Sequence, residues 1–220
     1  AGDIAINETD AINLLDVDTA NGTITVTASG QITATDVATD GTVGEDISLT
    51  ATADGIEVVS VDAGAADVTL DAAAAITKSG AGLVTAGTLT ADAATGIDLN
   101  TTVATLDASV TGAGGITISE TDAINLLDVD TANGAVTVTA GGQITATDVA
   151  SLTDNDANDI TLTGVGIVVG TVTAGAGAAA DVTLDAGAGA ITKSGAGLVT
   201  ADTLTADAAT GIDLNTTVAT

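Results

Sequence analysis

The stretch TITVTA at residues 23–28 alternates polar and apolar residues, and four later stretches repeat the pattern. A period of two is typical of a β-strand that buries one face. Because the stretches recur about every 20 residues, we expect them to stack as parallel strands, with Ile24 and Val26 heading two buried columns. The four later stretches are DISLTA (46–51), DVTLDA (67–72), TLTADA (88–93) and TLDASV (105–110).

A second short strand follows each of these stretches after a turn, and an apolar residue opens every one. A weaker third segment can be drawn after it, as at Val37. Two or three short strands in a coil of ~20 residues are typical of a parallel β-solenoid, in which neighbouring coils hydrogen-bond to one another. A β-sandwich is the alternative fold, but it would not explain the in-register period. The sequence therefore predicts an all-β parallel β-helix without substantial α-helix.

On a larger scale the chain holds nearly two copies of one unit. Residues 6–38 and 118–150 differ at four positions, and residues 76–105 and 191–220 differ only at Gly87 and Asp202. The unit is thus about 112–115 residues long. We expect one continuous solenoid over 1–220, composed of unit A (1–112) and unit B (113–220), both parts of a longer array.

The strands of unit B should continue the column that Thr23 begins, giving about nine to ten coils in all. Their expected starts lie near Val136, Asp159, Asp181 and Thr203.

Composition excludes many functions. The chain has no His, Cys, Met, Pro or aromatic residue, its only two cationic side chains are lysines, and its net charge is −28. Cys/His metal sites and Ser-His-Asp triads are therefore impossible, and nucleic-acid binding lacks cations and stacking rings. With 45% apolar residues, the chain is nevertheless too hydrophobic for a disordered one. No apolar run is long enough to span a membrane.

Three strings carry a resemblance to a known family: GTITVTASGQITATDV (22–37), DVTLDAAAAITKSGAGLVTAGTLTADAATGIDL (67–99) and GAGGITIS (112–119). They resemble the repeat regions of filamentous-haemagglutinin-like and autotransporter-type giant bacterial adhesins. The resemblance extends over the whole chain. It implies a right-handed parallel β-helix, secretion, and a place in a cell-surface or extracellular stalk, and it carries over no functional residue.

The acidic residues suggest a hypothesis of Ca²⁺ binding. Aspartates are expected to stack on adjacent coils, where like charges repel, so either salt screens them or divalent cations bridge them. Two oxygen-rich loops, 154–159 and 16–21, also suit Ca²⁺, although neither has EF-hand spacing. The alternative is that these residues form Asx-turns at coil corners. The candidate ligands are Asp154, Asp156, Asn158, Asp159, Asp16, Asp18, Asp46, Asp67, Asp71 and Asp92.

Lys78 and Lys193 fall at inward positions of the strand pattern. We expect each side chain to extend to solvent, with the alternative of a covalent crosslink to an Asp or Asn.

The sequence favours a non-catalytic stalk or fibre segment of a giant extracellular protein. Its expected partners are neighbouring repeats of the same chain or protein, with no nucleic acid and no membrane insertion by this segment. One alternative is an ice-binding solenoid, for which Thr23, Thr25 and Thr27 form a suitable row, although Asp46 and Asp67 interrupt the row's first column. The other alternative is a β-helical polysaccharide-degrading enzyme that uses two carboxylates as acid and base.

Overall fold

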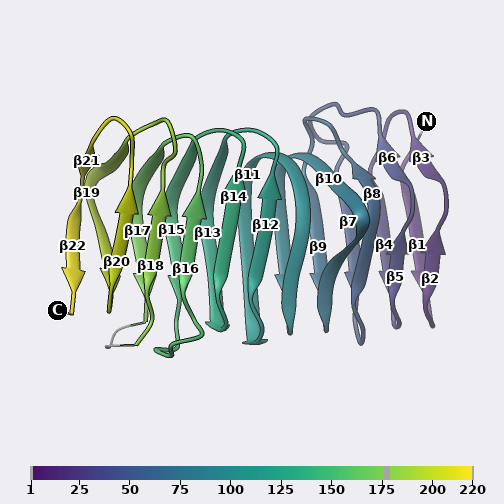
Figure 1. Ribbon diagram of the computed structural model, residues 1–220. Coiled ribbons are helices and arrows are strands. Elements are labelled where there is room, and N and C mark those ends of the chain that lie inside the picture. The colour runs from purple at the N-terminus through teal and green to yellow at the C-terminus, as the bar shows by residue number, and fades with distance from the viewer. Residues whose placement is uncertain (1, 176–178, 220) are drawn as a thin grey trace.

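The molecule is a parallel β-solenoid of about ten turns, seen from the side in Figure 1. The computed structural model describes residues 2–175 and 179–219. Within them every regular element is a strand, so no helix is available to cross a membrane. The strands are β1 (Ile4–Glu8), β2 (Ile12–Leu14), β3 (Val17–Thr19), β4 (Ile24–Ala28), β5 (Ile32–Ala34), β6 (Val37–Thr39), β7 (Ile47–Ala51), β8 (Ile56–Asp62), β9 (Val68–Ala72), β10 (Ala75–Ala93), β11 (Gly96–Ala113), β12 (Ile116–Glu120), β13 (Ile124–Asn133), β14 (Val136–Ala140), β15 (Ile144–Ser151), β16 (Ile160–Thr163), β17 (Ile167–Ala174), β18 (Val182–Asp185), β19 (Ile191–Ala201), β20 (Leu204–Asp207), β21 (Ile212–Asp213) and β22 (Asn215–Val218).

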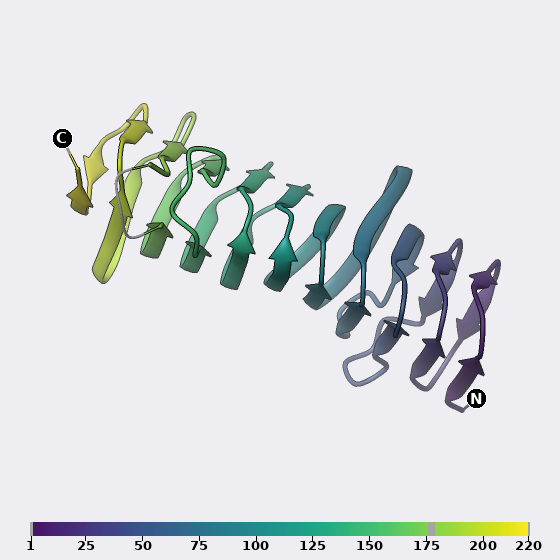
Figure 2. The ribbon, with the colours of Figure 1, turned by 90° about the horizontal axis from the view of Figure 1, so that it is seen from below.

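Each coil is flattened between two broad faces, and Figure 2 shows the chain ends at opposite ends of the rod. Face A is formed by β1, β4, β7, β9, residues 88–93 of β10, residues 105–110 of β11, and then β13, β15, β17, β19, β21 and β22. Face B is formed by β2 with β3, β5 with β6, β8, residues 75–85 of β10, residues 96–103 of β11, and then β12, β14, β16, β18 and β20. All of these pairings are parallel, as predicted.

The core is a narrow stack of aliphatic side chains between the two faces. On face B one inward column runs through eight successive coils, and each member is at most 2% exposed. Burying each such side chain contributes about 1.5–3 kcal/mol, and β-branched residues suit the strands that carry them. The column consists of Ile32, Ile56, Ile76, Ile97, Ile116, Val136, Ile160 and Val182.

The two units lie half a coil out of phase. On face A, five coil steps lead from Ile24 through Leu106 to Leu126. Val136, the counterpart of Ile24, follows half a coil later on face B. A unit therefore contains five and a half coils, and the same sequence occupies opposite faces in units A and B. The register irregularity between Leu106 and Asp107 lies where the two arrangements meet.

The half-coil shift between the two units shows that one prediction was wrong. The strands expected near Val136, Asp159, Asp181 and Thr203 do form, but they stack on the second strands of unit A, on face B, and do not continue the Thr23 column.

Candidate functional site

A group of aspartates on successive coils lies on face A, where the two units meet. There Asp71 pairs with Asp92, and Asp107 pairs with Asp128, on successive coils. Within the described residues, however, no three Asp or Glu side chains are grouped closely enough to hold a metal ion. We call this surface the acidic stripe; its members are Asp71, Asp92, Asp107, Asp128, Asp130 and Asp148.

Burial and mutual repulsion raise the pKa of three carboxyls in the stripe. Partial burial raises the pKa of Asp92, and the charges of Asp107, Asp71 and Asp130 add to the effect. Burial likewise raises the pKa values of Asp107 and Asp148, with further contributions from Asp128 and Asp130. These carboxylates therefore oppose folding when they are charged.

We expect the protein to become more stable as pH falls from neutral towards 3.8, the ordinary Asp pKa. A raised folded-state pKa means that the native chain binds more protons than the unfolded chain in this window. At neutral pH, Asp107→Asn and Asp148→Asn should each stabilise the fold by less than about 1 kcal/mol, since solvent screens partly exposed charges. The measurement is the urea midpoint as a function of pH. The exposed loop variant Asp156→Asn removes the same charge, and an equal gain from it would contradict a local effect.

The stacked aspartates Asp46 and Asp67 accept hydrogen bonds from the next coil. Asp46 Oδ1 accepts the backbone N–H of Asp67 at 3.1 Å, and Asp67 Oδ1 accepts that of Thr88 at 3.2 Å. In unit B, Asp159 and Asp181 accept the N–H groups of Asp181 and Thr203, each at 2.9 Å. This is a corner-capping role like the Asx-turn alternative. These hydrogen bonds use one oxygen of each carboxylate. Calcium binding by these residues stays a prediction.

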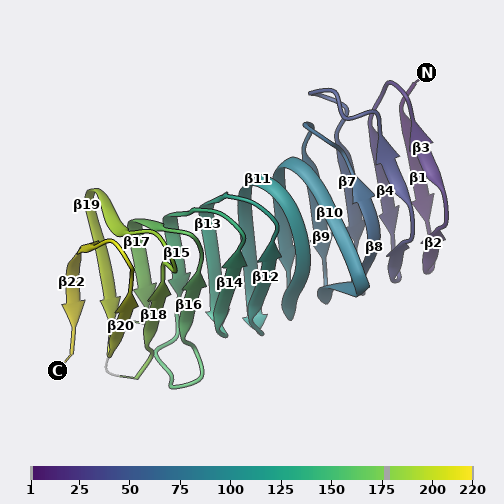
Figure 3. The same cartoon turned by 45° about the horizontal axis from the view of Figure 1, so that its top comes forward.

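The loop at 154–159 is held by its own polar side chains. Asp154 Oδ1 accepts the backbone N–H groups of Ala179 and Ala180 at 3.1 and 3.2 Å. Asn158 is buried, and its amide donates to Asn133 Oδ1 and to the Thr153 carbonyl. The loop projects beside β16, as Figure 3 shows. The other predicted loop places Asp16 and Asp18 on the exposed surface, where burial, Asp16 and Asp36 raise the pKa of Asp18.

If Ca²⁺ bridges these carboxylates, millimolar CaCl₂ should raise the melting temperature well beyond NaCl of matched ionic strength. Binding to the folded state alone stabilises it by mass action, whereas screening depends on ionic strength. The measurement is thermal unfolding followed by circular dichroism. Equal shifts in the two salts would exclude a specific site.

Both lysines form ion pairs with the following coil. Lys78 Nζ donates to Asp98 on β11, and Lys193 Nζ donates to Asp213 on β21. Asp98 and Asp213 are at least half exposed, so each pair lies at the surface, as expected for side chains that extend to solvent.

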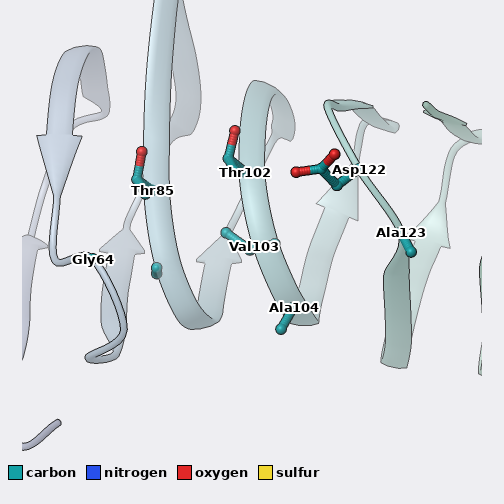
Figure 4. A pocket seen from close by; sticks show the side chains of 8 residues that line it. Gly64, Thr85, Thr102, Val103, Ala104, Asp122 and Ala123 are labelled. Carbon is teal, nitrogen blue, oxygen red and sulfur yellow. The ribbon is translucent and has the colours of Figure 1, made fainter. Parts of the chain in front are cut away.

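A shallow groove of about 300 Å³ opens where the coil corners of β10 and β11 are short. Thr85 and Thr102 occupy neighbouring rungs on its wall, and the Asp122 carboxylate lies beside Thr102 (Figure 4). The lining offers hydroxyls, one carboxylate and small apolar groups, and its Thr102 hydroxyl donates to Thr121.

Beneath the groove lies Glu120, which is 5% exposed. Its Oε2 accepts the Thr101 hydroxyl at 2.8 Å and the Val103 N–H at 3.0 Å, while its Oε1 accepts the Asp122 N–H at 3.0 Å. These bonds join two coils, so the role of Glu120 is structural.

Sequence reasoning missed Glu120 and four members of the acidic stripe. The alternation of Ile116, Ile118 and Glu120 already placed this glutamate inward. The stripe residues Asp107, Asp128, Asp130 and Asp148 come together only because unit B is shifted by half a coil. The half-coil shift could have been recognised from the sequence, because the strand starts near residues 105 and 135 lie about one and a half coils apart.

No protein-family model matches the chain, and neither curated proteins nor solved structures show significant similarity to it. The class that the fold defines is therefore the parallel β-solenoid, and the adhesin resemblance is taken up as a proposal.

Proposed function

We propose that this chain is a rigid, non-catalytic stalk segment of a giant extracellular or cell-surface protein of the adhesin type. The observation that carries the proposal is the unbroken inward column of face B, from Ile32 to Val182, which makes the segment one continuous rod. In a solenoid of this kind each coil contacts only its nearest neighbours, so every added coil makes the rod longer. Its partners would be adjoining repeats of the same protein.

Composition supports a mechanical role in preference to a catalytic one. The chain lacks His and Cys, and the Thr102 hydroxyl in the groove donates to Thr121. A β-helical polysaccharide hydrolase would need two carboxylates arranged around a substrate cleft and groups that hold the sugar. The acidic stripe instead lies on a broad face of the rod.

The repeat permits a direct test of length. Because residues 191–220 repeat residues 76–105 almost without change, a second copy of residues 106–220 can be fused directly after residue 220. The added unit holds five and a half coils, so a stalk should lengthen by ~26 Å at ~4.8 Å per coil. Small-angle X-ray scattering measures the maximum dimension of both proteins.

A cross-section that stays constant while the rod lengthens would support the stalk. A compact particle, or turnover of an acidic polysaccharide by the purified chain, would overturn it.

A further inference from the structure

The outward side of face B carries a regular array of hydroxyls. Thr117 on β12 is in register with Thr137 on β14, which is in register with Thr161 on β16. The same column continues through Thr183 to Thr205 on β20. A second column two residues along runs beside its first three rungs, and Figure 3 shows these strands side by side. We call the six residues of the three double rungs the face B hydroxyl block: Thr117, Ser119, Thr137, Thr139, Thr161 and Thr163.

Two features of this block bear on what it can bind. It contains no charged side chain, although the chain has 30 acidic residues. In addition, none of its six hydroxyls makes a side-chain hydrogen bond to another described residue. Some hydroxyls elsewhere are satisfied internally, as where Thr102 donates to Thr121 at 2.9 Å. The hydroxyls of the block must therefore find their partners in water.

Unit A repeats the array on the opposite face. Thr25 and Thr27 on β4 are in register with Ser48 and Thr50 on β7, and the first column continues through Thr69 to Thr90. The shift of half a coil between units thus gives the rod one hydroxyl block on each broad face. We call the unit A array of Thr25, Thr27, Ser48 and Thr50 the face A hydroxyl block.

The spacing of each block is set by the sheet. Rungs repeat at ~4.8 Å, and outward residues along a strand repeat at ~6.6 Å. Both distances lie near the main oxygen repeats on a prism face of hexagonal ice. Threonine also holds a methyl group beside each hydroxyl, and its stiff χ1 keeps the array ordered. We propose that the two hydroxyl blocks adsorb to crystalline ice, a binding activity beyond the stalk role.

Other occupants fit the blocks less well. A neutral crystalline polysaccharide would be expected to stack on aromatic rings, and the chain has none. A second copy of the chain would bring together two rods of net charge −28.

The test is partitioning of the fluorescently labelled 220-residue chain into slowly grown ice, alongside microscopy of ice recrystallisation. We expect the protein to be enriched in the ice fraction and to slow crystal growth. The variant Thr137→Lys/Thr161→Lys projects two long side chains from the face B block. It should lose part of the enrichment, because the face A block remains. Adding Thr25→Lys and Ser48→Lys, which lie on the two rungs of the face A block, should abolish the enrichment.

The matched control is Thr145→Lys/Thr192→Lys, which adds the same charge to outward positions of face A outside both blocks. It should partition like the parent. Lysine substitutions reduce the net negative charge, and circular dichroism confirms that each variant is folded. Exclusion of the parent from ice, equal loss in the control, or adsorption to cellulose powder instead of ice would overturn the proposal. None of these results bears on the rod length that tests the stalk.

Discussion

Replacing Glu120 with alanine should lower the free energy of unfolding by about 3–5 kcal/mol. The substitution removes a buried side chain that accepts three hydrogen bonds from two coils. It leaves a cavity and removes the acceptor of the buried Thr101 hydroxyl and of the Val103 and Asp122 N–H groups. Urea unfolding followed by circular dichroism gives the free energy. Glu120→Gln keeps the volume and part of the bonding, so it should fall between the alanine variant and the parent.

The repeat supplies a matched control for this experiment. Glu8 occupies the same place in unit A as Glu120 does in unit B. Its Oε1 accepts the N–H groups of Thr9 and Asp10 at 2.7 and 3.2 Å and the Thr9 hydroxyl at 3.4 Å, all from its own coil. Glu8→Ala should therefore cost much less than Glu120→Ala. Similar losses from the two variants would show that the inter-coil bonds of Glu120 contribute little.

The local sequence pattern predicted the strands and the solenoid, because the alternation of polar and apolar residues and the repeat of about 20 residues can both be recognised from one coil to the next. TITVTA at residues 23–28 and its successors do form the stacked strands that were expected, with Ile24, Ile47 and Val68 in one column. The phase between units was harder to predict. Similarity of sequence suggested that Val136 would stack in the column of Ile24, yet hydrogen bonding joins it to Ile116 directly below. Each coil hydrogen-bonds to the coil beside it in space, whether or not the two sequences are similar.

The candidate site was predictable only in part for the same reason. Asp71 and Asp92 were placed on adjacent coils correctly, since both lie in unit A. The stripe residues Asp128, Asp130 and Asp148 come from unit B, which is shifted by half a coil, so the sequence indicated that the surface is acidic but not where these residues lie. The hydroxyl blocks show a similar limit. The outer columns around Thr23 are broken by aspartates, whereas the central columns through Thr25 and Thr137 are continuous.

Replacing Gly114 with alanine should also destabilise the fold strongly, by about 3 kcal/mol, because the coils touch at this corner. A Cβ on Gly114 would lie 1.9 Å from the Thr95 carbonyl oxygen of the adjoining coil, and a Cβ on Gly134 would lie 2.0 Å from the Gly114 oxygen. Both obstacles are backbone atoms, so relief requires separating coils whose hydrogen bonds hold them together. The N–H of Gly114 is itself bonded to the Asn133 carbonyl at 3.0 Å.

We expect Gly114→Ala to lower the urea midpoint. Because the clash separates coils near the middle of the rod, it should also expose the Ile97 and Ile116 side chains beside it. Faster hydrogen exchange at β11 and β12 than at β4 and β7 in the Gly114 variant would locate the damage. Uniform acceleration along the whole chain would instead mean that the solenoid unfolds as one cooperative unit, whichever corner is strained.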